Sequence, residues 1–230
     1  MHLPGPPNRA FWRTIFEIAE TVEARFVVIE SAPRGAGLAH DRDLAKLAHP
    51  AWVPPVMQQF AGDVNGYTLL WRLEGQPQAV GSFDLYDLES TYNSSGRGVF
   101  YFDEWEDAQT ERRKTFKAVD FFTGEACVGL YYDERADPEL YFYDFEGEPE
   151  PLGIDIGGYL QLLTLSLGFY YWQVLVVELA RPDSPRPYVP ARDVHRQLDL
   201  LNFVDTMPQL YPAFSLEAFV ALYDQVRLRR

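Results

Sequence analysis

The chain has 230 residues, of which 20 are basic and 34 are acidic, so its formal net charge is −14 with the histidines neutral. Hydrophobic residues make up 47% of the sequence and aromatic residues 15%, which excludes wholesale disorder, because disordered chains lack such residues. The negative charge argues against nucleic acid as a ligand, since binding to phosphates requires Lys and Arg, and it favours a basic protein partner.

The single cysteine and the apolar segments indicate in which cellular compartment the protein is expected. Cys127 is the only cysteine, which excludes an intramolecular disulfide, and its apolar surroundings predict a buried side chain. The first seven residues lack the basic and apolar regions of a secretory signal. Residues 159–180 are apolar, but polar side chains and Gly168 interrupt them, which predicts a buried core helix rather than a membrane span. We therefore expect a cytoplasmic protein without membrane contact.

The N-terminal part shows mainly helical patterns. Apolar residues recur at spacings of three and four over residues 11–25, which predicts an amphipathic helix. Residues 26–29 fit either a short strand or the buried end of a helix, because four residues are too few for periodicity to decide. A helical turn is expected over residues 43–48, and a helix is expected to begin near Pro54, where proline suits a first turn.

The middle of the chain predicts a β-sheet. The turn at Asn65 and Gly66 precedes a strand over residues 67–73, and a second strand over residues 79–85 completes an antiparallel hairpin. Further short strands are expected over residues 99–102, 116–121, 126–132 and 140–143. Because we expect no helix between these strands, they favour an antiparallel sheet.

Helical patterns return in the C-terminal part. Asp155 is placed to cap a helix with an apolar face, and the four prolines of residues 181–190 predict a stiff connector. Two helical patterns follow, over residues 194–204 and 216–228, which are too few residues for a core of their own. We expect a main domain over residues 1–180, a connector over 181–190 and a helical extension over 191–230 packed on the main domain. The predicted fold class is α+β, a mainly antiparallel sheet with helices on one side.

No set of catalytic residues emerges. Cys127 lies in a predicted buried strand, no Gly-x-Ser-x-Gly elbow is present, and the four histidines have no evident partner. Residues 40–43 with His49 lack the spacing of a zinc site, residues 103–107 lack the ligand pattern of an EF-hand, and residues 96–98 fit no phosphate-binding loop. We therefore predict no catalytic residue, no metal and no cofactor, and keep a hydrolase that uses a carboxylate pair as the third hypothesis.

Negative charge concentrates between residues 84 and 150, where 18 acidic residues outnumber six basic residues, a net charge of −12. This region is either an ordinary solvated surface or a negative face that attracts a basic partner. The sharpest candidate contact segment consists of Asp103, Glu104, Trp105, Glu106 and Asp107. An aromatic residue within a charged rim is typical of a binding hot spot, although Trp105 fits a core position equally well. Asp133 and Glu134, in a later acidic loop, are the next candidates.

A series of short motifs follows the predicted elements in a distinctive order. They are Phe60-Ala61-Gly62-Asp63-Val64-Asn65-Gly66, Leu70-Trp71, Gly81, Val128-Gly129-Leu130-Tyr131-Tyr132, Pro151-Leu152, Tyr159-Leu160, Gly168-Phe169 and Trp172. Their order and spacing resemble the SUKH superfamily, which includes the SMI/KNR type of cell-wall-assembly regulators and many bacterial immunity proteins. The resemblance covers residues 50–175, and residues 191–230 lie outside it.

The resemblance implies an α+β domain that binds proteins and has no enzymatic activity. Many bacterial members are similar to immunity proteins, each of which neutralises a cognate toxin, often a nuclease or deaminase. The resemblance implies structural roles for Asn65, Gly66, Trp71, Gly81, Tyr159, Leu160, Gly168 and Trp172. The leading hypothesis is therefore an immunity protein that blocks a toxin through an acidic surface, and the alternative is a regulatory or scaffolding module that docks through its C-terminal extension.

Overall fold

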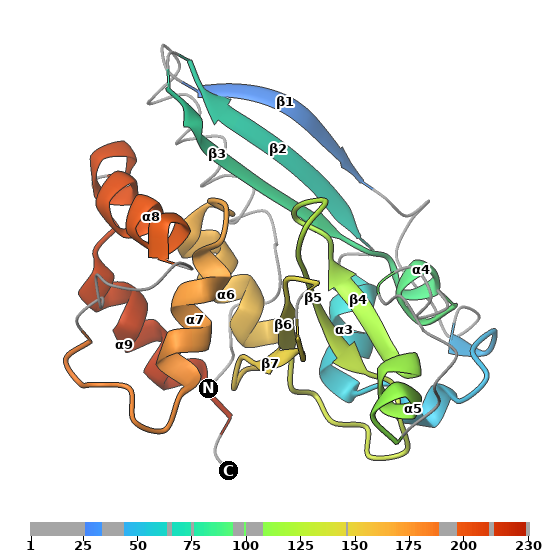
Figure 1. The fold of residues 1–230 in the computed structure, drawn as a ribbon. Coiled ribbons are helices and arrows are strands. Elements are labelled where there is room, and N and C mark those ends of the chain that lie inside the picture. The colour runs from blue at the N-terminus through green and yellow to red at the C-terminus, as the bar shows by residue number, and fades with distance from the viewer. Residues whose placement is uncertain are drawn as a thin grey trace.

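The computed structural model describes residues 26–33, 44–63, 66–74, 76–93, 99, 108–145, 147–188, 197–211 and 214–228 (Figure 1). These residues form one seven-stranded antiparallel sheet with helices packed on it, so the predicted α+β class is confirmed. The helix expected over residues 11–25 lies outside the described residues.

The first three strands form the long upper part of the sheet in Figure 1. They are β1 (Phe26–Pro33), β2 (Tyr67–Leu73) and β3 (Gln76–Leu85). Residues 26–29 therefore belong to a strand. The predicted hairpin of β2 and β3 is confirmed, and β3 begins three residues earlier than the sequence pattern indicated.

The remaining strands are short and follow in chain order. They are β4 (Phe116–Asp120), β5 (Cys127–Tyr131), β6 (Tyr141–Tyr143) and β7 (Glu150–Pro151). Each strand pairs with the next one along the chain, but β3 and β4 pair only at Leu85 and Asp120. The strand expected over residues 99–102 lies outside the described residues except for Val99, which is in a turn.

The helix expected to begin near Pro54 is confirmed as α3 (Pro55–Asp63), and the 3-10 helix η1 (Pro50–Trp52) precedes it. Two short helices occur where only strands and loops were expected, α4 (Leu88–Asn93) and α5 (Ala108–Lys114), both between β3 and β4. The expectation of strands uninterrupted by helices is therefore wrong. With six and seven residues, α4 and α5 are too short to show a helical period of apolar residues, so the pattern could not reveal them.

The apolar stretch over residues 159–180 forms parts of two helices rather than the single helix expected. These are α6 (Ile156–Ser166) and α7 (Trp172–Ala180), and the predicted cap is present, since Asp155 accepts a 2.9 Å hydrogen bond from the amide of Gly158. Leu167 and Tyr171 have φ angles of 56° and 61°, so the chain leaves the helical conformation between the two helices. Among the described residues, no helix combines the length and the apolarity needed to cross a bilayer.

The linker between α6 and α7 attaches to the edge of β3. The amide of Ser82 donates to the carbonyl of Gly168 at 2.7 Å, and the amide of Tyr170 donates to the carbonyl of Val80 at 3.0 Å. These bonds satisfy backbone groups of β3 that β4 does not reach, and they fix both helices against the sheet.

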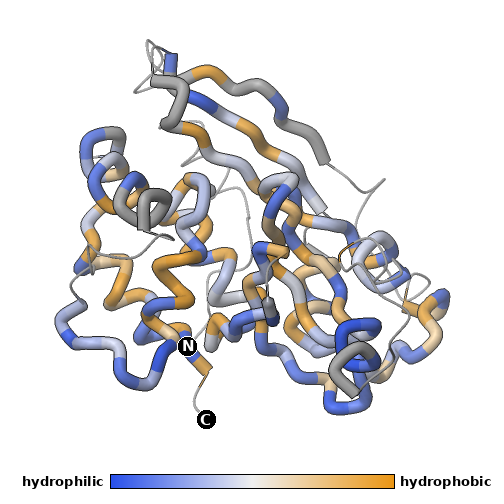
Figure 2. The backbone as a smooth tube through the Cα atoms, viewed as in Figure 1, coloured by the Kyte–Doolittle hydropathy of each residue, from blue (hydrophilic) through white to orange (hydrophobic). Residues whose placement is uncertain are grey.

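The C-terminal helices α8 (Gln197–Leu210) and α9 (Leu216–Val226) pack on α7 and α6. Phe203, Met207 and Phe219 are fully buried and belong to the same hydrophobic core as the sheet and α6. Figure 2 shows hydrophobic residues concentrated along α6 and α7, the helices between the sheet and the C-terminal pair. The C-terminal helices therefore complete the core.

Strands β4 to β6 divide their side chains between two faces. Val128, Leu130 and Phe142 belong to the main core with the helices, whereas their neighbours Cys127, Tyr131 and Tyr143 belong to a second, smaller cluster on the opposite face. This period of two is the normal alternation of a strand. Both faces are apolar, which explains why all three strands are buried along their whole length.

Candidate functional site

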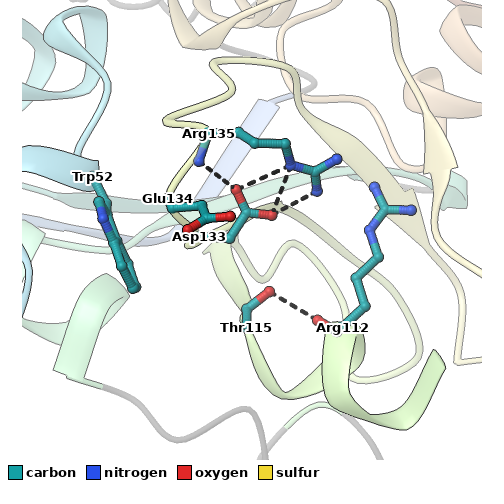
Figure 3. Close-up of a pocket in the computed structure, with 6 residues that line it drawn as sticks. All are labelled: Trp52, Arg112, Thr115, Asp133, Glu134 and Arg135. Carbon is teal, nitrogen blue, oxygen red and sulfur yellow. Dashed lines mark hydrogen bonds and ion pairs between the residues drawn. The ribbon is translucent and has the colours of Figure 1, made fainter. Parts of the chain in front are cut away.

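The clearest candidate site is a shallow pocket at the end of β5 with a volume of about 390 Å³. We call it the Trp52 pocket, and its lining residues are Trp52, Arg112, Thr115, Asp133, Glu134 and Arg135. In Figure 3, Trp52 stands at one end and Arg112 at the other, with the turn of Asp133, Glu134 and Arg135 between them. Helix η1, the end of α5 and the turn after β5 thus meet at one surface.

Trp52 is held in position by other aromatic rings. Its ring stacks on His49 with a centroid separation of 3.8 Å and an interplanar angle of 18°, and it forms a T-shaped pair with Tyr132 at a centroid separation of 5.5 Å. The hydroxyl of Tyr132 accepts a 3.0 Å hydrogen bond from the amide of His49, which ties η1 to the end of β5. Trp52 is only partly buried, so it combines a fixed orientation with access from the pocket.

The turn after β5 is fixed by an ion pair within it. Arg135 donates to both carboxylate oxygens of Asp133, with Nη2 lying 2.6 Å from Oδ2, and its amide donates to Oδ1 at 3.0 Å. The hydrogen bonds from Arg135 lower the pKa of Asp133 below its ordinary value. Glu134, between them, is exposed, and its carboxylate has no hydrogen bond or ion pair with the described residues.

Arg112 forms the opposite end of the pocket. Its guanidinium lies 4.1 Å from the ring centroid of Tyr131, a cation–π geometry. The hydroxyl of Thr115 donates to the backbone carbonyl of Arg112 at 2.8 Å and so fixes the end of α5. Among the described residues, the guanidinium of Arg112 forms no ion pair at contact distance, unlike that of Arg113, which pairs with Glu148, although the charge of Arg112 contributes to the lowered pKa of Asp133.

A row of aromatic rings extends from this point across the sheet face opposite α6 and α7. Neighbouring ring centroids in the row are between 4.9 and 6.3 Å apart. The row consists, in order, of Tyr86, Phe121, Phe145, Tyr143, Phe116, Tyr131 and Tyr141. It supports Arg112 from below through Tyr131, so the position of Arg112 depends on the packing of this face.

Most acidic residues described between positions 84 and 150 are engaged in local contacts. Glu89 pairs with Lys46, and Glu111 pairs with Lys114. Among the described carboxylates of this region, those of Glu125 and Glu134 make no hydrogen bond or ion pair. Many acidic side chains of this region are therefore engaged in contacts within the protein. The carboxylate of Glu134 makes none with the described residues, and it lies in the Trp52 pocket.

One carboxylate titrates near neutral pH, but it is inaccessible. Asp120 is fully buried, and burial raises its pKa to about 7, while hydrogen bonds from Tyr159 and the amide of Asp84 oppose the shift. Its oxygens accept these bonds at 2.6 and 2.7 Å. Asp120 lines neither pocket described here, so it lacks the access that a catalytic carboxylate needs.

The predicted contact residues fall into two groups. Asp103, Glu104, Trp105, Glu106 and Asp107 lie outside the described residues. Asp133 and Glu134 lie in the Trp52 pocket, where the structure adds Trp52, Arg112 and Arg135, which the sequence analysis did not select. The signal for Trp52 was weak, since it lies in η1, a helix of only three residues, which carries no periodic pattern.

The residues of the family-like motifs lie mainly in the core. Trp71 and Gly81 are cross-strand partners in β2 and β3, and the indole of Trp71 covers Gly81. Tyr159 and Trp172 are fully buried, and Leu160 is 3% exposed. Two glycines occupy turns with positive φ, Gly66 at 84° and Gly168 at 66°, a conformation that suits glycine. Asn65 lies outside the described residues.

Other candidate groups are in structural positions. Cys127 is buried, and burial raises the pKa of its thiol, as does the nearby Asp120. His49 stacks on Trp52, and residues 40–43 lie outside the described residues. In the part of the chain that the structure describes, no three His, Cys, Asp or Glu residues are grouped so that they could hold a metal ion.

A second pocket, of about 730 Å³, lies between the connector and α9. Arg186 is central to it and donates to the carbonyls of Leu179 and Pro185 at 3.1 and 3.0 Å, to the hydroxyl of Ser184 at 2.8 Å and to Asp224 at 3.4 Å. Its guanidinium thus joins the end of α7, the connector and α9. We interpret this pocket as a structural junction, because the arginine at its centre is already saturated with protein partners.

Comparison of this chain with protein-family models, with curated proteins and with solved structures gave no match. The resemblance to the SUKH superfamily therefore stays a prediction from the motifs.

Proposed function

We propose that this chain is a non-enzymatic protein-binding domain, and that it acts as an immunity protein that neutralises a cognate toxin. The observation that carries the binding proposal is the Trp52 pocket, where a partly buried tryptophan lies at one end, Arg112 at the other, and between them Glu134, whose carboxylate has no ion pair among the described residues. Binding hot spots have this composition, an aromatic or arginine anchor within a polar rim. The immunity role is supported by the motif resemblance and by the net charge of −14, which attracts a basic partner.

The shape of the pocket also favours a macromolecular partner. It is open and shallow, and its walls come from η1, α5 and the turn after β5. Small-molecule sites are typically enclosed, whereas this pocket is open and four of the six residues that line it carry a charge. A protein surface can cover such a pocket and reach its charged ends at the same time.

The regulatory alternative placed its docking surface in the C-terminal extension. Phe203, Met207 and Phe219 of this extension are fully buried in the common core. Deleting residues 183–230 would therefore expose the core, and loss of partners in such a deletion would not identify a docking surface. Substitution of the pocket residues separates the two proposals without this complication.

The experiment is capture of partners from the protein's own cells with the tagged full-length chain, at low and high salt. We compare the wild type with Trp52→Ala and with the control Tyr188→Ala, which removes a partly buried aromatic residue on the connector. We expect one stoichiometric basic protein with the wild type and the control, weakened by salt, and at least about a tenfold loss with Trp52→Ala, because a hot-spot residue contributes about 2 kcal/mol or more.

The immunity role has its own test. The captured protein is expressed alone and together with this chain, and growth is measured. Toxicity that the wild-type chain relieves, and that Trp52→Ala relieves poorly, supports the proposal. A captured protein that is harmless alone, or several substoichiometric partners, contradicts the immunity role and favours the regulatory alternative.

A further inference from the structure

The charges of the Trp52 pocket are unequally satisfied. Asp133 and Arg135 neutralise each other through the fork of hydrogen bonds between them. Glu134 and Arg112 have no such partner among the described residues, and they lie on opposite sides of this pair in Figure 3. A ligand that completes the pocket must therefore supply a positive group on the side of Glu134 and Trp52, and an acceptor on the side of Arg112.

The surroundings of Glu134 favour a planar cation. One face of the Trp52 ring is covered by the parallel ring of His49, and the indole lines the pocket beside Glu134. A guanidinium can lie flat against an indole and also donate two parallel hydrogen bonds to a carboxylate. A lysine ammonium is a strongly hydrated point charge that lacks this fork, so arginine suits the site better.

The two contacts of such a guanidinium occur separately within this surface. Arg112 lies 4.1 Å over the ring of Tyr131, and the guanidinium of Arg135 forms a fork with Asp133. Neither arginine is free to reach both Trp52 and Glu134, because each is engaged at its own site. Tyr131 and Asp133 thus each contact an arginine of this chain, whereas no arginine of the described residues occupies the position between Trp52 and Glu134.

We propose that the Trp52 pocket receives an arginine side chain of the partner protein, with its guanidinium against the indole of Trp52 and hydrogen-bonded to Glu134. Arg112 then binds a carboxylate or carbonyl of the same partner segment, which sets the direction in which the segment crosses the pocket. This inference rests on the proposed function and specifies the chemistry of the partner.

The test uses the full chain and the peptide acetyl-Gly-Arg-Gly-amide, with peptides containing citrulline or lysine in place of arginine. Citrulline keeps the planar shape and removes the charge. The signal is the indole N–H resonance of Trp52, assigned by its loss in Trp52→Phe, since the chain has five tryptophans. We expect a saturable shift with the arginine peptide and binding at least about fivefold weaker with the other two.

Variants connect the shift to the pocket. Glu134→Gln is expected to weaken binding of the arginine peptide at least about fivefold, because it replaces the carboxylate of a charge-assisted pair with a neutral amide. The matched control is Glu125→Gln, which changes another exposed, unpaired carboxylate outside the pocket and should leave binding unchanged. Equal shifts with arginine and citrulline, or no effect of Glu134→Gln, would overturn the proposal.

The outcomes also separate this inference from the proposed function. If the arginine peptide does not shift the Trp52 resonance but Trp52→Ala still reduces capture of the partner, the pocket binds a protein by other chemistry and only the arginine inference is wrong. If neither peptide binding nor partner capture depends on Trp52, both are wrong.

Discussion

The hydroxyl of Tyr159 on α6 donates a 2.6 Å hydrogen bond to the carboxylate of Asp120 on β4. A register shift between Ala118 and Asp120 turns this carboxylate toward the helices, and Gln173 on α7 donates to the same hydroxyl at 3.0 Å. The three side chains join the sheet to both core helices. The side-chain carbonyl of Gln173 is buried and has no hydrogen bond among the described residues.

This network predicts a stability that falls as pH rises. Burial raises the pKa of Asp120 to about 7 from an ordinary value of 3.8, so between these values the folded protein holds a proton that the unfolded chain has released. Raising the pH through this window therefore destabilises the fold, by at most about 4 kcal/mol at about 1.4 kcal/mol per pKa unit.

Asp120→Asn tests this dependence, because asparagine stays neutral, accepts from the amide of Asp84 and donates to Tyr159. Urea unfolding at about pH 5 and about pH 8 should show the variant gaining stability relative to the wild type at the higher pH. Groups that titrate in both proteins cancel in this difference. A difference that is the same at both pH values would mean that Asp120 does not titrate in this range.

Gly81→Ala should destabilise the fold. A Cβ at Gly81 would overlap the indole of Trp71, which is 1% exposed and donates a 2.7 Å hydrogen bond to the carbonyl of Leu167. Overpacking of this kind costs about 1–3 kcal/mol. Chemical denaturation measures the loss, and the control is Gly62→Ala in α3, where an added Cβ meets nothing within 4 Å. If both variants are equally stable, the indole of Trp71 can move aside for the added Cβ and is not held tightly against position 81.

Phe203→Ala should destabilise the whole protein by about 3–5 kcal/mol, because it removes a fully buried ring from the common core. Thermal unfolding should remain a single transition at a lower temperature, since α8 shares its core with the sheet. The control is Asp205→Ala on the exposed side of α8, with little expected effect. Two separate transitions would instead indicate that the C-terminal helices unfold independently.

Arg186→Gln should destabilise the junction of α7, the connector and α9 by about 1–3 kcal/mol, because it removes charged hydrogen bonds to several partners. Arg227→Gln is the matched control, since that arginine is exposed and only reaches Asp224 at 3.7 Å. Equilibrium unfolding measures both. A larger effect of Arg227→Gln would contradict the structural role assigned to Arg186.

The acidic segment selected from the sequence can be tested independently of the pocket. Changing Asp103, Glu104, Glu106 and Asp107 to Lys should slow association with a basic partner and leave folding intact, because electrostatic steering acts mainly on the association rate. Surface plasmon resonance with the captured partner gives the rates, and circular dichroism checks folding. An unchanged association rate would contradict the hypothesis that this segment forms an acidic contact face, and the Trp52 pocket would then remain as the candidate contact.

The sequence predicted those helices and strands that show a clear periodicity of apolar residues or follow a residue typical of a turn or a helix cap. The hairpin of β2 and β3 follows a favourable turn with Gly66, and the helix capped by Asp155 begins where expected. The break between α6 and α7 was not predicted, because two non-glycine residues, Leu167 and Tyr171, take positive φ angles there. Their conformation depends on contacts with β3 that are distant in sequence.

The candidate site was only partly predictable for the same reason. Asp133 and Glu134 stand out as neighbouring charges, but Trp52 and Arg112 come from segments 81 and 21 residues before Asp133. Their meeting is a result of the sheet, since Tyr132 holds η1 and Tyr131 supports Arg112 at the end of the same strand. A single sequence contains no local signal for such a meeting.

The single residue pair between β3 and β4 has a consequence for how the molecule opens. The sheet consists of two hydrogen-bonded ladders, β1 to β3 and β4 to β7, that pair only at Leu85 and Asp120, where backbone bonds from Tyr86 to Val119 and from Phe121 to Asp84 join them. Amide hydrogen exchange should therefore report two cooperative units rather than one, with the β1 to β3 ladder exchanging as a block. The hydrogen bonds of Ser82 and Val80 with the α6–α7 linker, together with the burial of Trp71 and Phe83 in the common core, then contribute to the free energy at which that block separates from the rest.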